Sequence, residues 1–228
     1  MQTFGTTKGM YYFFLDGIRK EYTNTVPPDV FNRIINEAQL IWLDSRIAKM
    51  DQDEEAIKAI APVLVTDYDL PTGFNVPENL YRLRVAYASF KDVPPGCNIN
   101  RIRCRPYKHN VAYEENPFRK PGYKNPYIYE KDGKYIFVAG DYEVKEVNLT
   151  YIRIPRSIYF DSQREEDLSF PLIKDIPIYT PGTGSVPCEF HIEQRREIVD
   201  TAVRIFLERR TDPRYQSFLQ EQLIRGDN

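Results

Sequence analysis

The sequence is poor in the residues that most often carry chemistry. Its 228 residues include two histidines, His109 and His191, and three cysteines, Cys97, Cys104 and Cys188, none of which belongs to a CxxC pair. An odd, unpatterned set of cysteines argues against a disulfide framework and favours a reducing compartment. Neither GxSxG nor HExxH occurs, and no GxGxxG follows a predicted strand. We therefore expect no catalytic residues, no bound metal, no cofactor and no enzyme activity.

Long apolar runs and a surplus of basic charge are missing as well. No stretch reaches the roughly 18–20 apolar residues that a membrane span needs. The apolar run at 10–15 is too short for a signal peptide and lies beside Asp16 and Arg19. The 31 basic residues are offset by 33 acidic ones, for a net charge of −2. This balance argues against a dedicated nucleic-acid binder, although it does not exclude local basic patches.

Aromatic side chains are abundant instead, with 17 Tyr and 13 Phe beside a single Trp. Tyr combines a large contact area with a polar tip, so an excess of Tyr is typical of protein interfaces. A Tyr-rich β-sheet explains the same excess equally well. At this length the chain can bury a proper core, as one domain or as two small ones.

Helical periodicity is strongest near the two ends of the chain. Apolar residues recur at three- and four-residue spacing over Asp29–Met50, where Ile35 and Ile41 are expected to be buried, and again over Glu189–Arg210. Shorter helical patterns occupy 10–22, 54–61 and 213–225. Gly17 weakens the first of these by about 1 kcal/mol relative to Ala.

An acidic cluster precedes the helix predicted at 54–61. It consists of Asp51, Asp53, Glu54 and Glu55. Oxygen ligands suit calcium or magnesium, but the spacing lacks the Gly and the terminal Glu of a calcium loop. Acids at the start of a helix are favoured by the helix dipole, and this is the interpretation that we prefer.

The middle of the chain shows the alternation that is typical of β-strands. In the strand predicted over 80–90, Leu83, Val85 and Tyr87 are expected on one face. A hairpin is predicted at 127–138, because Asp132-Gly133 is a turn pair that tolerates positive φ. Further strands are expected at 63–68, 99–105 and 147–155.

Arginines occupy every second position of the strand predicted at 99–105. Arg101, Arg103 and Arg105 are expected on one face, with the residues between them on the other. Such a row could contact phosphates in register on one sheet face. The alternative is a solvated face, or pairing with acids on a neighbouring strand or subunit, and the net charge favours this alternative.

The segment 106–126 holds four prolines and cannot continue a central strand. It is longer than most loops, and long loops in compact domains are usually functional or disordered. It is the best candidate in the chain for an arm that reaches a partner, and the alternative is a surface loop without a role. The candidate subunit-interface residues are aromatic and lie in this segment or just after it: Tyr113, Phe118, Tyr123 and Tyr127.

Two stretches before the last long helix have a superficial likeness to catalytic motifs. TPGTGS at 180–185 is rich in glycine but lacks the Lys and the following Ser or Thr of a phosphate-binding P-loop, so we interpret it as a loop. Cys188 and His191 lie three residues apart at the start of the helix, where a thiol pKa can be lowered. No oriented base is evident besides His191, so a structural cysteine is the preferred interpretation.

These patterns together predict an α+β fold. Helices from the N- and C-terminal parts of the chain, residues 1–62 and 187–228, are expected to form a helical bundle. An antiparallel β-domain is expected as an insert over 63–186, and this β-rich domain would carry the long arm or loop at 106–126.

Five segments, taken in order, resemble one known family. They are RIINEAQ (33–39), NPFRKP (116–121), DGKYIFV (132–138), LTYIRIP (149–155) and CEFHIEQRREIVDTAV (188–203). The order is similar to that of head–tail adaptor, or ring, proteins of short-tailed bacteriophages. The nearest likeness is to the ring proteins of crAss-like phages and to the tail tubular adaptors of podoviruses. The motifs are structural rather than catalytic, and the tract 157–187 has no firm match.

The resemblance implies a virion structural protein without enzyme activity. It would form a homo-oligomeric, twelve-fold head–tail connector ring between the portal protein and other tail or ring proteins. DNA would be only passing cargo in the ejection channel, and no membrane would be contacted. The location implied is the virion, at the tail and portal vertex, after assembly in the cytoplasm of the host bacterium. A near-neutral chain fits a channel wall that must not hold DNA, and Tyr-rich loops fit subunit contacts.

Two other functions remain open from the residues alone. The first is a small nucleic-acid-binding protein that uses the basic β-sheet face of Arg101, Arg103 and Arg105, which would require salt-dependent binding to DNA. The second is a cysteine-dependent enzyme centred on Cys188, which would require selective labelling of that thiol near neutral pH.

Overall fold

The computed structural model describes residues 4–18, 26–71, 73–91, 101–106, 121–122, 124–164, 182 and 184–209. The chain divides into two compact units. The first unit consists of Met1–Pro62 with Pro155–Asn228, and the second unit consists of Val63–Ile154. The division predicted from the sequence, with an insert over 63–186, differs from this one in the tract that follows Ile154.

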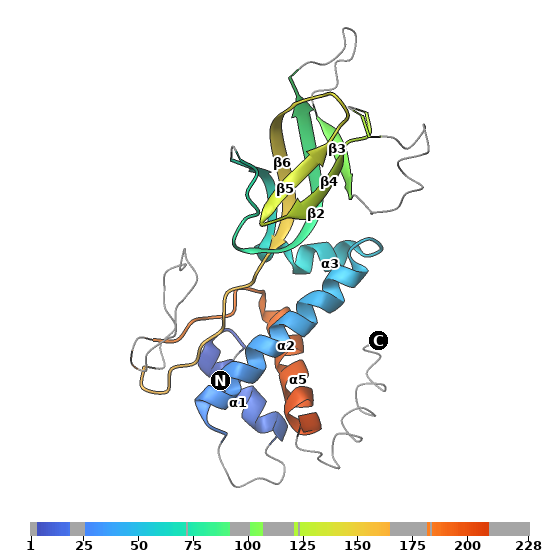
Figure 1. Ribbon diagram of the computed structural model, residues 1–228. Coiled ribbons are helices and arrows are strands. Elements are labelled where there is room, and N and C mark those ends of the chain that lie inside the picture. The colour runs from blue at the N-terminus through green and yellow to red at the C-terminus, as the bar shows by residue number, and fades with distance from the viewer. Residues whose placement is uncertain are drawn as a thin grey trace. The chain divides into compact units, whose positions relative to one another are not determined.

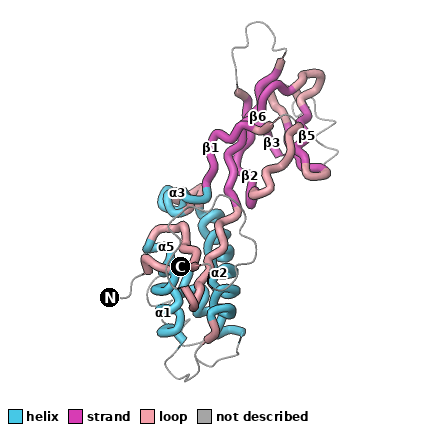
Figure 2. Tube along the Cα trace, turned by 90° about the vertical axis from the view of Figure 1, so that its left-hand side faces the viewer, coloured by secondary structure: helices cyan, strands magenta, loops and turns pink. Residues whose placement is uncertain are grey.

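The first unit contains four α-helices among the described residues. They are α1 (Thr7–Ile18), α2 (Pro28–Lys49), α3 (Glu54–Ala59) and α5 (Ile192–Arg209), and a short 3-10 helix, η1 (Ala61–Val63), follows α3. Both α1 and α2 pack against α5, as Figure 1 and Figure 2 show. The helix predicted at 213–225 lies outside the described residues.

Aromatic and aliphatic side chains fill the space between these helices. The ring of Phe14 on α1 lies 5.4 Å from that of Phe31 on α2 and 5.6 Å from that of Phe206 on α5, centroid to centroid. Met10 and Ile35 are fully buried beside them. Full burial of side chains of this size contributes roughly 1.5–3 kcal/mol each, so this cluster holds the three helices together.

Gly17 sets how closely α1 approaches α5. A Cβ placed at this position would lie 2.7 Å from Cγ2 of Val203 on α5, nearer than real side-chain carbons come. Val203 is β-branched, so its rotamer within a helix cannot easily turn away. The glycine that weakens α1 as an isolated helix is therefore needed for its packing.

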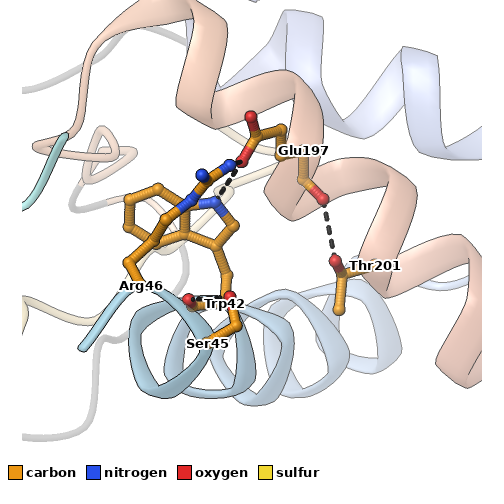
Figure 3. A network of polar contacts seen from close by, with 5 residues as sticks. All are labelled: Trp42, Ser45, Arg46, Glu197 and Thr201. Carbon is orange, nitrogen blue, oxygen red and sulfur yellow. Dashed lines mark hydrogen bonds and ion pairs between the residues drawn. The ribbon is translucent and has the colours of Figure 1, made fainter. Parts of the chain in front are cut away.

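A polar contact joins α2 to α5 (Figure 3). Trp42 Nε1 donates a hydrogen bond of 2.5 Å to Glu197 Oε2, and the Arg46 guanidinium pairs with the same carboxylate oxygen. Arg46 also lies over the indole, with its Cζ 5.7 Å from the centre of the Trp42 ring. One carboxylate on α5 thus receives two donors from α2, and the cation covers the aromatic face.

Two neighbouring apolar side chains of α2 are left at the surface. Ile41 is 40% exposed and Leu40 is 38% exposed. The helix itself is confirmed, but the prediction that Ile41 is buried is wrong. The buried face of α2 instead includes Gln39, a polar residue that is 2% exposed. A pattern that counts only apolar residues cannot find a buried face that includes a polar one.

Amide side chains tie the extended segment 155–161 to α2. Asn36 binds both backbone groups of Ile158, donating from Nδ2 to the carbonyl (2.7 Å) and accepting at Oδ1 from the N–H (2.8 Å). Asn32 makes the same pair of bonds with Phe160, at 3.1 and 2.8 Å. Gln39 Nε2 continues the row with a 2.9 Å bond to the next alternate carbonyl. This amide ladder supplies the partners that a neighbouring strand would otherwise give the backbone.

Asp161 closes the end of the same segment. It is 1% exposed, and its carboxylate accepts backbone N–H bonds from Gln163 (2.9 Å), Gly182 (2.5 Å) and Gly184 (3.0 Å). Burial alone would raise the pKa of this carboxyl, but the N–H donors outweigh burial and hold the pKa below its usual value. Described residues of the glycine-rich stretch 180–185 thus bind a carboxylate of the chain itself, which agrees with its interpretation as a loop.

The second unit is a six-stranded sheet with the strand order β1-β6-β2-β3-β4-β5 (Figure 2). The strands are β1 (Leu64–Asp69), β2 (Leu80–Phe90), β3 (Ile102–Pro106), β4 (Tyr127–Lys131), β5 (Lys134–Val138) and β6 (Val144–Arg153). Neighbouring strands are antiparallel except β3 and β4, which run parallel. The predicted hairpin is confirmed as β4–β5, with Asp132 at φ +52° and Gly133 at φ +71° in its turn.

The predicted fold class is wrong. The described residues do not show a helical bundle from N- and C-terminal helices, and the sheet is not purely antiparallel. A curled, half-barrel sheet of six strands dominates a mixed α/β fold that also has four helices among the described residues. The long connection 107–126 gives the chain room to add β4 parallel to β3, and strand direction across such a connection leaves no mark in the residue pattern.

A β-bulge changes which side chains of β2 face the core of the sheet. Leu83 and Val85 lie opposite consecutive residues of β6, so Arg84 between them is the extra residue of the bulge. As a result, Leu83 packs against the sheet core, whereas Val85 and Tyr87 do not. The strand over 80–90 is confirmed, but the placement of Leu83 on the same face as Val85 and Tyr87 is wrong.

Candidate functional site

A pocket of about 500 Å³ is lined by β2, β3 and the chain at the start of β4. Its charged lining residues are all basic: Arg84 from β2, Arg103 and Arg105 from β3, and Lys124 from just before β4. Acidic side chains do not contribute to it within the described parts of the chain. We call this site the basic pocket.

Alternation along β3 exposes the arginines at this site. Arg103 and Arg105 are exposed, whereas Ile102 and Cys104 are buried in the sheet core, as the sequence pattern predicts. Burial raises the pKa of the Cys104 thiol to about 12, so the thiol stays protonated and packs like a small apolar group. Burial of Ile102 and Cys104 therefore also determines the side of β3 on which Arg103 and Arg105 lie.

The sequence pattern does not identify two of the four basic residues of the pocket. Arg84 is the extra residue of the β2 bulge, a feature that commonly re-aims a side chain. Lys124 precedes β4 within a proline-rich segment that has no periodicity. The alternation predicted for 80–90 places Arg84 on the face opposite Leu83 and Val85 and gives no sign of the bulge.

Arg101, the remaining arginine of the row, has a different environment. Its guanidinium lies 3.2 Å from the carboxylate of Asp67 on β1. The alternative predicted for the arginine row was pairing with acids on a neighbouring strand or subunit, but Asp67 lies on β1, which is not next to β3 in the sheet. Arg103 and Arg105, in contrast, form no ion pair with any residue of the described ranges. The row therefore contains one neutralised arginine and two that are not neutralised by a described residue.

A smaller polar pocket of about 190 Å³ lies next to Arg101 on the sheet. Asn148, which is 5% exposed, donates from Nδ2 to Asp69 Oδ1 at 3.0 Å. Its Oδ1 and the Ser89 Oγ are buried without a hydrogen-bond partner in the described part of the chain. Glu146 completes a lining with charges of both signs. Mixed charge makes this pocket a weaker attractor of anions than the basic pocket.

The four candidate subunit-interface residues cannot be compared as a set. Tyr113, Phe118 and Tyr123 lie outside the described residues. Tyr127 is 3% exposed and lies in β4, opposite Arg105 on β3 and Val138 on β5. The assignment of these four residues to a subunit interface remains a prediction.

Cys188 does not have the environment of a reactive thiol. It is 1% exposed, and its Sγ lies 3.9 Å from Gln39 Oε1, to which it donates. Burial raises the pKa of this thiol to about 11, so it is protonated at neutral pH. His191, three residues further on, is exposed. These properties favour the structural interpretation of Cys188.

The acidic cluster at 51–55 has a structural explanation. Asp53 is the N-cap of α3, and its Oδ1 accepts the backbone N–H of Glu55 at 2.9 Å. Within the described ranges, no group of three or more His, Cys, Asp and Glu residues is arranged to hold a metal ion. None of the helices in those ranges is both long enough and apolar enough to cross a bilayer.

The chain matches no protein-family model, and no curated protein matches it significantly. The functional inference therefore depends on the chain's own residues and on the resemblance described above.

Proposed function

We propose that the protein is a structural component of a phage virion, whose copies form the connector ring between the portal protein and the tail. The order of the five sequence segments supports this proposal, because it resembles that of ring proteins of short-tailed phages. The observation that carries it is the pair of neighbouring apolar side chains, Leu40 and Ile41, that α2 leaves at the surface of the first unit.

A ring closes when one surface of each subunit fits a different surface of the next subunit. The buried centre of such an interface is apolar and well packed. Single exposed apolar residues are ordinary, but Leu40 and Ile41 are adjacent on the longest helix of the unit. Ile192, at the start of α5, is 54% exposed and offers a second apolar position for the complementary surface.

The division into two compact units supports the same role. A connector subunit must contact its neighbours in the ring as well as the layers on either side of the ring. Two units, each with buried residues of its own, offer separate surfaces for these contacts. The net charge of −2 also fits a channel wall that lets DNA pass without holding it.

A surface variant of α2 tests the proposed contact. Wild-type protein should form rings of one defined size by negative-stain electron microscopy and light scattering, alone or on the portal protein. Leu40→Ser combined with Ile41→Ser should leave a folded monomer with an unchanged circular dichroism spectrum, because neither side chain belongs to the buried core of the unit. Ala48→Ser, at another exposed position of α2, is the matched control and should assemble normally. Rings that survive the double substitution would exclude α2 from the subunit contact.

A further inference from the structure

The smaller pocket on the sheet, of about 190 Å³, is built on one face of three neighbouring strands. Asn148 on β6 lies opposite Asp69 on β1 and opposite Tyr87 on β2. The next pair on the same face is Glu146 on β6 with Ser89 on β2, because residues two apart in a strand point to the same side. These side chains line the pocket together, and we call it the polar pocket.

The buried side of the polar pocket contains hydrogen-bond acceptors without a donor. Asn148 is 5% exposed, and its Nδ2 donates to Asp69 Oδ1 at 3.0 Å, which holds the amide on the face of the pocket. Its Oδ1 is buried and has no hydrogen-bond partner in the described part of the chain, and the same is true of Ser89 Oγ. Because buried polar atoms in proteins nearly always have a partner, these two oxygens indicate a donor that the pocket receives.

The charges of the polar pocket are negative in excess. Asp69 forms no ion pair with any described residue, and Glu146 pairs only with its exposed neighbour Lys145. Arg101 is the one cation among the described lining residues, and it is paired with Asp67 at 3.2 Å. The missing donor is therefore expected to carry a positive charge.

A primary ammonium group has the properties that this pocket requires. It combines a positive charge with three N–H donors and has no acceptor. The half-buried Tyr87 adds an aromatic ring, whose face attracts cations. A metal ion fits less well, because no group of three or more His, Cys, Asp and Glu residues in the described ranges is arranged to hold one. A volume of about 190 Å³ also exceeds what a single ion fills.

We propose that the polar pocket binds a primary ammonium group, carried by a small aliphatic amine or by a lysine side chain. The ammonium donates hydrogen bonds to Asn148 Oδ1 and Ser89 Oγ, and the carboxylate of Asp69 offsets its charge. This inference goes beyond the connector role and does not rest on it.

Calorimetric titration of the full chain tests this proposal with two probes, putrescine for a free amine and Nα-acetyl-lysine methylamide for a lysine side chain. At least one probe should bind with a dissociation constant of about 1 mM or below, and the probe that binds more tightly identifies the source of the ammonium. Tetramethylammonium has the charge but no N–H donor, so it should bind at least about tenfold more weakly.

Three variants separate the site from overall charge and from folding. Asp69→Asn keeps an oxygen for the Asn148 amide but removes the charge, and it should weaken binding at least about tenfold. Ser89→Ala removes an oxygen without a described partner, so it should weaken binding while the thermal unfolding midpoint does not fall. Glu78→Gln, at an exposed position of the second unit outside the pocket, is the matched control and should change affinity less than about twofold.

Three results would overturn the proposal. The first is no binding of either probe at concentrations up to about 10 mM. The second is equal loss of affinity in Asp69→Asn and Glu78→Gln, which would reduce the effect to overall charge. The third is binding of tetramethylammonium as tight as that of the probes, which would remove the role of the two buried oxygens. Because ring assembly is measured separately, a failure here leaves the connector proposal unaffected.

Discussion

The two compact units use their polar side chains in opposite ways. In the first unit, several buried polar side chains bind the backbone of the chain itself: the amide ladder of α2 binds segment 155–161, and Asp161 accepts hydrogen bonds from backbone N–H groups. In the second unit, Arg103 and Arg105 have no acidic partner among the described residues. Polar groups that are fully satisfied fix a structure, whereas charges that are left unpaired are available to a ligand.

Removal of the Asp161 carboxylate should have the largest effect on the first unit. Asp161→Ala leaves the N–H groups of Gly182 and Gly184 without their acceptor, and each unsatisfied buried group costs about 1–3 kcal/mol. We expect the free energy of unfolding, measured by urea denaturation, to fall by about 3–5 kcal/mol. Asp161→Asn keeps the shape and one acceptor oxygen and should lose less. No loss of stability in Asp161→Asn would show that the negative charge is unimportant.

The same carboxylate predicts a direction for the pH dependence of stability. Its folded pKa is lowered because the backbone donors bind the ionised form. Its contribution is therefore complete above the unfolded value near 3.8 and is lost as the pH falls through the lower, folded value. Urea midpoints measured downward from pH 5 should decline more steeply for the wild type than for Asp161→Asn. Parallel declines would contradict this role of Asp161.

A break in the amide ladder should have the next largest effect. Asn36→Ala leaves both the N–H and the carbonyl of Ile158 without their partner. We expect a loss of about 2–3 kcal/mol in the free energy of unfolding. Arg33→Ala, at an exposed position of α2, is the control and should change stability by less than about 0.5 kcal/mol. If the two variants behave alike, segment 155–161 is held by other contacts.

Gly17→Ala should reduce the free energy of unfolding by a smaller amount. Helix propensity alone would predict an increase. Ala favours a helix by about 1 kcal/mol over Gly, but its Cβ would collide with Val203 on α5. Overpacking typically costs about 1–3 kcal/mol, so a net loss of about 1 kcal/mol is expected. Val203→Ala should relieve the collision, so a double-mutant cycle should show coupling between the two positions. An increase in stability for Gly17→Ala alone would contradict the close approach of α1 to α5.

The smallest effect on stability is expected in the second unit. Arg103→Gln combined with Arg105→Gln removes exposed charges that have no acidic partner among the described residues. The free energy of unfolding, measured by thermal denaturation, should therefore change by less than about 0.5 kcal/mol. A large loss of stability would mean that these arginines are structural, and the contrast between the two units would fail.

The local elements could be predicted from the sequence to a large extent. The stripe of α2, the strand at 80–90 and the Asp132-Gly133 turn each arise from residues that are near neighbours in the chain, and each is present. The arginine alternation of β3 is likewise local and is confirmed. Patterns of this kind report which side of an element is apolar, and they hold wherever the buried side is made of apolar residues.

The errors arose where distant residues decide the outcome. Ile41 is exposed, whereas Gln39 is buried and donates a hydrogen bond to a backbone carbonyl far along the chain. Leu83 changes face because one extra residue, Arg84, enters the pairing with β6. The sequence pattern identified only two of the four basic residues of the basic pocket. Lys124, for example, reaches the pocket because β4 pairs in parallel with β3. None of these pairings has a signature within a short window of sequence.

The native mass of the purified full chain, measured over a wide concentration range with and without the portal protein, tests the connector proposal most directly. A connector ring predicts one defined high-order species, alone or only with the portal protein, and its mass gives the copy number. A monomer at every concentration, unchanged by the portal protein, would contradict the connector proposal.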